Sequence, residues 1–189
     1  MLHPDVVLKK GGITKKGLFS KKKIPKGTIV YKAKDDVRIY SISQYNKFSK
    51  RYQNILTKFA YQENDKIIHH VDNTKHGNHS CESNVYVMQD NAYMDIALRD
   101  IEAGEEVTWD YGVLLPTWHK PLRCKCGSSK CRGMIYRLPP NSKVSSKLKL
   151  LAKKAKKNLL KVKQPLLDKR ELQDFQRGLE PINKNNITI

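Results

Sequence analysis

Residues 104–112 read GEEVTWDYG and form the central one of three motifs that together decide the fold. Upstream, residues 78–84 read NHSCESN, and downstream, residues 124–131 read CKCGSSKC. A polar turn with a stray cysteine would account for residues 78–84 alone. The order of all three motifs along one chain is a more specific signal than any one of them. The three motifs are therefore interpreted together.

The four cysteines are distributed unevenly, since three lie within residues 124–131 and Cys81 lies more than forty positions upstream. The N-terminus lacks the basic segment and apolar run of a secretory signal, and in such a chain this spacing indicates a metal site before a disulfide. Three thiolates on a tight loop leave one vertex of a zinc tetrahedron open, and one further thiol can fill it. We therefore predict a structural Zn²⁺ bound by Cys81, Cys124, Cys126 and Cys131.

Other states of these residues stay open. Cys124 and Cys126 could form a disulfide, which would be geometrically strained, or the thiols could be free and buried. His119 and the adjacent His69 and His70 carry suitable ligand atoms, but four cysteines already complete a zinc site.

In this order, the three motifs resemble those of the SET-domain lysine methyltransferases. Residues 78–84 resemble the family's asparagine-histidine-serine-cysteine segment, residues 104–112 its terminal tyrosine segment, and residues 124–131 its post-SET zinc loop. The segments KGLF at 16–19 and IPKG at 24–27 look like its opening strand and turn. The resemblance covers about residues 6–136. It implies a mainly β SET fold of short curled, β-clip-like sheets with an inserted helix and a C-terminal pseudoknot, a rare threaded topology.

The same resemblance implies S-adenosylmethionine as the methyl donor and Tyr111 as the catalytic residue. The implied donor-binding residues are Lys16, Gly17, Leu18, Phe19, Asn78, His79 and Tyr111. The implied lysine channel is lined by Trp109, Tyr61, Tyr86 and Tyr31, although periodicity alone would also fit each tyrosine as a core aromatic. Such a channel would favour the neutral amine, because burial disfavours its charged form.

Three positions depart from the family pattern. Lys15 stands where glycine is frequent, and Ser83 stands where proline is usual. Trp109 takes a position commonly held by phenylalanine or tyrosine, where a hydroxyl limits the product to monomethyl-lysine. Because tryptophan lacks the hydroxyl but is bulkier, the resemblance leaves the number of methyl groups open.

Short strands with tight turns are expected over residues 6–33, a strand over 66–71, a hairpin over 85–98 broken at Asp90-Asn91, and a strand over 107–109. Apolar residues recur at helical spacing over 41–60, which predicts one helix capped by Ser41 or Ser43. We divide the chain into a SET domain (1–115), a post-SET zinc segment (116–138) and a basic helical tail (139–189).

The tail holds 13 basic and 4 acidic residues. It predicts a helix that ends at Pro165 and a weaker one after it. The expected apolar stripe of the first helix is Val144, Leu148, Leu151, Ala155, Leu159 and Val162, and that of the second is Leu172, Phe175 and Leu179. The lysine face either only faces water or contacts nucleic acid or a nucleosome.

The 189-residue chain carries 37 Lys and Arg against 18 Asp and Glu, a formal charge of +19. This length fits one domain with a short appendage. Charge of this sign favours acidic partners or merely keeps the chain soluble. Because no segment approaches the roughly 18 apolar residues of a membrane span, we expect a soluble intracellular protein of the cytoplasm or nucleus, including a host nucleus if the source is a microbe.

The predicted function is methylation of lysine ε-amines in proteins, with histone tails as the leading substrate and a ribosomal or other basic protein next. Two other classes stay open. One is a non-catalytic SET-like module that docks on chromatin, which the departure at Lys15 would fit. The other is a zinc-dependent DNA-binding protein, which would show salt-dependent DNA affinity through the cysteine loop. The sequence does not predict the oligomeric state.

Overall fold

The structure is a computed structural model that describes residues 1–34, 37–88 and 94–178. Within these ranges, no helix combines the length and apolarity needed to cross a lipid bilayer. Its elements in chain order are β1 (Val6–Lys10), β2 (Lys16–Ser20), β3 (Ile29–Lys32), β4 (Val37–Ser41), α1 (Ile42–Lys47), α2 (Lys50–Phe59), β5 (Ala60–Glu63), β6 (Lys66–His70), η1 (Asn73–His76), β7 (Asn78–His79), β8 (Val85–Met88), β9 (Met94–Ala97), β10 (Glu106–Trp109), η2 (Tyr111–Val113), β11 (Leu122–Arg123), β12 (Met134–Ile135), α3 (Lys143–Leu159) and α4 (Lys169–Gln176).

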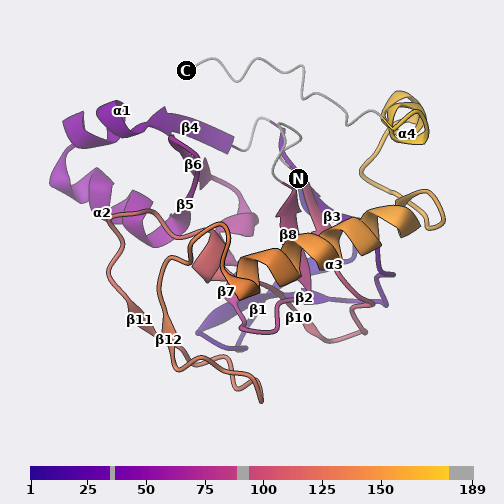
Figure 1. Ribbon diagram of the computed structural model, residues 1–189, viewed down its shortest axis with the longest axis horizontal. Helices are drawn as coiled ribbons and strands as arrows, with labels where there is room; N and C mark the ends of the chain where they lie inside the picture. Colours follow the sequence, from indigo (N-terminus) through magenta and orange to yellow (C-terminus); the bar gives the residue numbers. More distant parts are fainter. Residues whose placement is uncertain (35–36, 89–93, 179–189) are drawn as a thin grey trace.

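The strands form small sheets rather than one large one (Figure 1). Their orders are β1-β2-β10-β7, β3-β9-β8 and β4-β6-β5, with β11 and β12 as a separate pair. Strand β10 pairs antiparallel with β2 and parallel with β7, so three segments far apart in sequence become neighbours. This insertion of β10 is the part of the expected C-terminal crossing that the strand pairing records, and it places residues 78–79 beside residues 108–109.

Strands β8 and β9 pair as the expected hairpin, while Asp90 and Asn91 lie outside the described residues. Both strands are buried along their whole length. Successive side chains of a strand point to opposite faces, so each strand contributes to two cores. Tyr86, Met88 and Ile96 pack in one cluster, and Val85, Val87 and Ala97 in another.

The expected helix over residues 41–60 is two helices, and the prediction of one continuous helix is wrong. Ser41 caps α1 in a reciprocal capping box with Gln44. Ser49 caps α2 by accepting a hydrogen bond from the backbone N–H of Tyr52. A serine side chain satisfies the free N–H groups of a helix start, so the second serine begins a new helix where the periodic pattern continued.

The basic helix α3 is an integral part of a core. It lies across β8 and β9 and buries Leu148, Ala152, Ala155 and Leu159 against Tyr86, Met88 and Ile96 (Figure 1). The apolar stripe is thus confirmed as a packing face over this length, with Val144 and Leu151 partly buried beside it. The chain division at residues 115 and 138 stays a proposal.

The prediction that α3 continues to Pro165 is wrong, because the helix ends at Leu159 and Val162 lies beyond it. The buried side chain of Gln164 donates from Nε2 to the carbonyl oxygens of Leu159 (2.8 Å) and Gly27 (2.9 Å). Its Oε1 accepts from the backbone N–H of Ile29 at 2.8 Å. Gln164 therefore satisfies a free carbonyl at the helix end and ties the tail to β3. The second helix, α4, is observed, while Leu179 lies outside the described residues.

Two adjacent leucines test whether the tail belongs to the core. Leu159 is 1% exposed and Leu160 is 46% exposed. We expect Leu159→Ala to lower the free energy of unfolding by about 2–5 kcal/mol, as for other buried leucines. Leu160→Ala should change it by less than about 0.5 kcal/mol, as for other surface positions. Urea unfolding followed by circular dichroism measures both, and equal small effects would show that α3 does not pack as described.

Candidate active site and metal centre

The pairing of β7 with β10 brings the first two motifs together. Thr108 lies opposite Asn78, and Trp109 lies opposite His79. The buried Asn78 amide donates from Nδ2 to the Lys16 carbonyl at 2.8 Å and to Glu106 Oε1 at 2.6 Å. Residues from three distant segments that were predicted to bind the donor therefore meet at one place.

Glu106 completes this group, and the sequence did not point to it. Its Oε2 accepts from the backbone N–H of Ile13 at 2.9 Å. A Cβ atom on Gly12 or Gly17 would overlap the Glu106 carboxylate, so both glycines leave room for it. Of the remaining predicted donor-binding residues, Leu18 is fully buried in the core and Phe19 is partly exposed. Leu18 can thus offer only its backbone to a ligand.

A cavity opens beside this group and has Tyr111 in its wall. It is also lined by Tyr61, His70, Gly77, Asp95 and Trp109. The Tyr111 hydroxyl donates a hydrogen bond to the Gly77 carbonyl, and burial raises the pKa of that hydroxyl to about 12, with the nearby Glu106 adding to the shift. The hydroxyl therefore stays protonated at neutral pH.

Two of the four predicted channel residues line this cavity and two do not. Trp109 and Tyr61 do, whereas Tyr31 and Tyr86 belong to other cores, so their assignment to this cavity is corrected. Because Val87 faces the cavity, its neighbour Tyr86 points the opposite way and packs under α3. Tyr31 packs edge-on against the cavity residue His70, with ring centroids 4.6 Å apart, and so lies one layer behind it.

Trp109 is held from two sides. Its Nε1 donates to Asp95 Oδ2 at 2.9 Å. A Cβ atom on Gly77 would overlap its six-membered ring, so the ring packs directly on the Gly77 backbone. The unusual tryptophan thus has a matching acid and a matching glycine in the surrounding structure.

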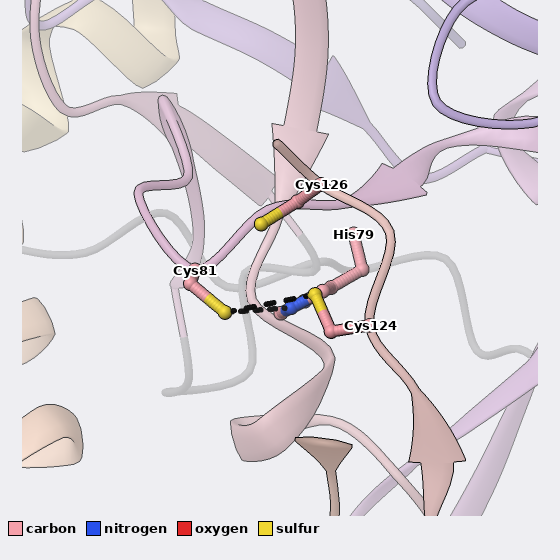
Figure 2. Close-up of side chains that lie close together, drawn as sticks. All are labelled: His79, Cys81, Cys124 and Cys126. Atoms are coloured by element: carbon pink, nitrogen blue, oxygen red, sulfur yellow. Dashed lines mark hydrogen bonds between the residues drawn. The ribbon is translucent and has the colours of Figure 1, made fainter. Parts of the chain in front are cut away.

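Three of the four predicted zinc ligands converge with His79 (Figure 2). One ligand atom from each of His79, Cys81, Cys124 and Cys126 lies within 4.8 Å of the others. The Sγ atoms of Cys81 and Cys124 are 3.8 Å apart. Zinc–sulfur bonds of about 2.3 Å in a tetrahedron place sulfur atoms about 3.8 Å apart. The donor set and this spacing fit a structural zinc.

The fourth predicted ligand, Cys131, is exposed and lies outside this close group, where His79 takes its place. The Cys131 thiol nevertheless lies near enough to hydrogen-bond Cys124 and Cys126 and so affects the pKa of both. Burial raises the pKa of Cys124 to about 12. Burial also raises the pKa of Cys126, but hydrogen bonds from the backbone of Cys81 and Ser128 outweigh it and bring that pKa to about 7.

The His79 ring is oriented by the chain around it. Its Nδ1 accepts the backbone N–H of Tyr111 at 3.0 Å, and its Nε2 lies 3.3 Å from Cys81 Sγ. Burial lowers the pKa of His79 to about 4, so the ring is neutral and carries its one proton on Nε2. In this tautomer Nε2 donates to the sulfur of Cys81, which is the role of a supporting group rather than of a metal ligand.

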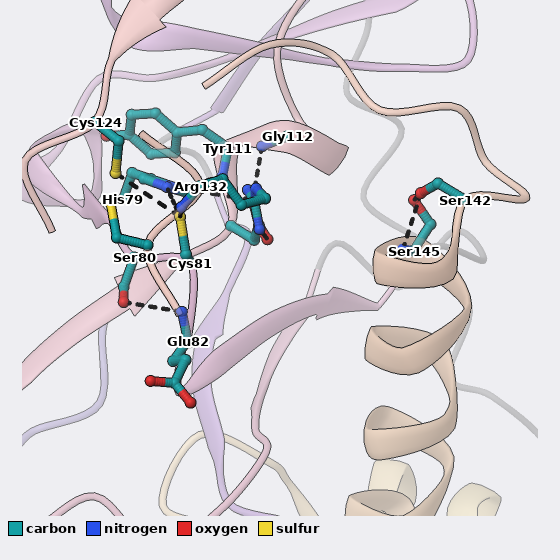
Figure 3. Close-up of polar contacts among 12 residues, drawn as sticks. His79, Ser80, Cys81, Glu82, Tyr111, Gly112, Cys124, Arg132, Ser142 and Ser145 are labelled. Atoms are coloured by element: carbon teal, nitrogen blue, oxygen red, sulfur yellow. Dashed lines mark hydrogen bonds and ion pairs between the residues drawn. The ribbon is translucent and has the colours of Figure 1, made fainter. Parts of the chain in front are cut away.

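Arg132 connects the cysteine loop with the tyrosine segment, a contact that sequence reasoning missed (Figure 3). Its guanidinium pairs with both carboxylate oxygens of Asp110 at 2.6 and 2.8 Å. Asp110 is buried and also accepts from the Gly112 N–H, which caps η2 at Tyr111. The Arg132 backbone N–H donates to Cys81 Sγ at 3.3 Å. The loop that would hold the metal therefore also fixes the backbone of Tyr111.

Comparison with known proteins places this architecture. A family model described as SET domain matches residues 15–112, just over half of the chain. The chain belongs to the SET-domain family. The matched region of this SET-domain protein contains Gly17, Asn78, Trp109 and Tyr111, and it ends before the cysteine loop.

Similar proteins agree with the family. Human Histone-lysine N-methyltransferase 2B is 37% identical over 76 residues, which is 34% of this chain and 3% of that protein. Histone-lysine N-methyltransferase TRX1 from Oryza sativa subsp. japonica is 41% identical over 63 residues, which is 31% of this chain and 6% of that protein. The SET-domain chain thus spans only a few per cent of these relatives.

A solved structure confirms the fold class. The methyltransferase domain of human Histone-lysine N-methyltransferase SETMAR superposes with a TM-score of 0.52 at 20% sequence identity, covering 72% of this chain and 59% of that one. The expected SET fold of small β-sheets with inserted helices is confirmed. At this level of identity the likeness concerns the fold alone.

Proposed function

We propose that this SET-domain protein transfers methyl groups from S-adenosylmethionine to lysine ε-amines of proteins. One observation carries the proposal: the protonated Tyr111 hydroxyl lies in the wall of a cavity next to the Asn78 and Gly17 cluster. An acceptor site and a donor site would thereby share one tyrosine. The names of the histone-lysine methyltransferases that the chain is similar to support the same reaction.

The donor side would be built from Asn78, Gly17 and the backbone near His79. When bound, S-adenosylmethionine supplies a methyl group made electrophilic by its sulfonium. By resemblance, the Asn78 amide meets the methionine moiety and the backbone at His79 meets the adenine. The amide is already oriented by Lys16 and Glu106, and such preorganisation lowers the entropy lost on binding.

The acceptor side would place a lysine stem between the aromatic rings of Tyr61 and Trp109. Exclusion of water there lowers the pKa of the ammonium, which gives one proton to solvent before transfer. The amine lone pair then forms the bond to the methyl carbon, and the carbon–sulfur bond breaks with its electron pair going to sulfur. Since the pKa of Tyr111 is about 12, its hydroxyl orients the amine and does not act as the base.

We also propose that Cys81, Cys124, Cys126 and Cys131 hold one structural Zn²⁺. The tautomer of His79, which donates toward Cys81, supports Cys131 as the fourth ligand. A closed four-coordinate site of this kind stabilises a fold and does no chemistry itself. It would hold the loop that carries Arg132 against the motif that carries His79 and Tyr111.

Histones are the proposed substrate because the similar proteins bear that name, and a chromatin location would follow from it. The lysine face of α3 supports a contact with nucleosomal DNA. On that face Lys147, Lys149, Lys153, Lys154 and Lys157 are exposed and form no ion pair within the described chain. Such a face would contribute salt-dependent affinity for DNA.

The decisive experiment incubates the protein with isotopically labelled S-adenosylmethionine and free core histones, nucleosomes, ribosomal proteins or a cell lysate. We expect label on lysine, located by mass spectrometry, and a stronger preference for nucleosomes at low salt than at high salt. Label on none of these acceptors would contradict the methyltransferase proposal and favour a non-catalytic SET-like module. A nucleosome preference that does not change with salt would contradict the role of α3 alone.

A further inference from the structure

Asp95 places a carboxyl group in the wall of the acceptor cavity, where the mechanism above gives it no part. It lies in β9 opposite Val87, and its side chain lines the cavity together with Trp109 and Tyr111. The residue is 4% exposed. A carboxyl group is costly to bury without polar partners, so an acid at this position requires an explanation.

The structure satisfies only half of this carboxyl group. Oδ2 accepts the indole N–H of Trp109 at 2.9 Å. Within the described part of the chain, Asp95 makes no other hydrogen bond and no ion pair. Burial raises its pKa to about 8, and the hydrogen bond from Trp109 opposes that shift. The second oxygen, Oδ1, therefore lacks a partner in a cavity meant for a ligand.

The cationic residues of the same cavity are turned to other groups. Lys75 Nζ donates to the Val71 carbonyl at 3.2 Å, and Lys58 Nζ lies 5.0 Å from the centroid of the Phe59 ring. Neither is bonded to Asp95. A donor for Oδ1 would thus have to arrive from outside, and the proposed acceptor brings an amine with N–H groups.

We infer that Asp95 Oδ1 accepts a hydrogen bond from the ε-amine of the acceptor lysine and thereby limits the product to dimethyl-lysine. The inference rests on the proposed function and deepens it. With its lone pair aimed at the methyl donor, a neutral lysine amine has two N–H groups, monomethyl-lysine has one, and dimethyl-lysine has none. The first two transfers keep the hydrogen bond, and a third would set a methyl group against a buried carboxyl oxygen.

Asp95 acts here as a positioning residue and takes up no proton. In each transfer the amine lone pair forms the new nitrogen–carbon bond, and the carbon–sulfur electron pair goes to sulfur. The proton lost by the incoming ammonium goes to water. A hydrogen bond to a carboxyl group of this kind corresponds to about a 10- to 100-fold difference in rate.

The test compares three synthetic peptides that span the lysine labelled by the wild-type protein, with that lysine unmodified, monomethylated or dimethylated. Single-turnover rates and products are measured by mass spectrometry. For the wild type we expect similar rates on the first two peptides and a rate at least about 10-fold lower on the third. Equal rates on all three peptides would overturn the inference without any variant, and would leave the methyltransferase proposal standing.

Asp95→Asn provides the matched change, because the amide oxygen can still accept from Trp109 while an NH₂ group faces the amine. We expect rates on the unmodified and monomethyl peptides to fall about 10- to 100-fold relative to the dimethyl peptide. Asp100→Asn, the same substitution at an exposed turn that binds Lys23, should keep the wild-type ratios. Unchanged ratios in Asp95→Asn would overturn the inference, and absence of label with the wild type would instead overturn the proposed function.

Discussion

Tyr111→Phe is expected to lower the rate of methyl transfer by about 10²- to 10³-fold, the usual loss when one preorganised hydrogen-bonding group at a reacting centre is removed. The variant keeps the ring and its packing. It loses the hydroxyl, which is protonated at neutral pH because burial raises its pKa to about 12. Single-turnover kinetics with labelled donor measure the rate, and isothermal titration calorimetry measures donor binding, which should change little.

Tyr136→Phe is the matched control for this experiment. Tyr136 is 47% exposed in β12, away from the cavity lining, and the substitution removes the same atom. Its rate should equal that of the wild type. Full activity in Tyr111→Phe would show that the hydroxyl does not orient the amine, and an equal loss in both variants would point to a general effect on folding.

Cys81→Ser is expected to release the metal and to lower stability by several kcal/mol, because binding of a structural zinc contributes directly to folding. Cys81 is the ligand that links the cysteine loop to the end of β7, since its sulfur lies 3.8 Å from that of Cys124. Without the link, the loop would also release Arg132 from Asp110. Zinc content by mass spectrometry and thermal unfolding with and without a chelator measure the two effects.

Two further variants separate the candidates for the fourth ligand. Cys131→Ser should lose zinc as Cys81→Ser does, whereas His79→Gln should retain it, because the His79 Nε2 donates toward the sulfur and Nδ1 is occupied by Tyr111. The reverse result would assign the fourth position to His79. A wild-type protein purified without bound zinc, and insensitive to chelator, would contradict the metal site as a whole.

Local signals in the sequence were sufficient for most of the fold. Ser41 and the repeated apolar spacing predicted a helix start, the alternating residues of 85–98 predicted a hairpin, and the apolar stripe of 144–159 predicted a packed helix. Each depends on contacts within a few positions along the chain. The errors lie where another local signal intervened, as at Ser49, or where a distant partner did, as at Gln164.

By itself, the sequence determined the family, the clustering of the cysteines, and the tyrosine and asparagine segments, because each of these is a pattern of residue types along the chain. Only the tertiary structure decided that Asp95 meets Trp109, that Arg132 meets Asp110, that His79 faces Cys81, and that Tyr31 and Tyr86 lie outside the cavity. These contacts depend on which strands pair and in which register. A shift of one residue would turn every side chain of a strand to its other face, and no local pattern records that choice.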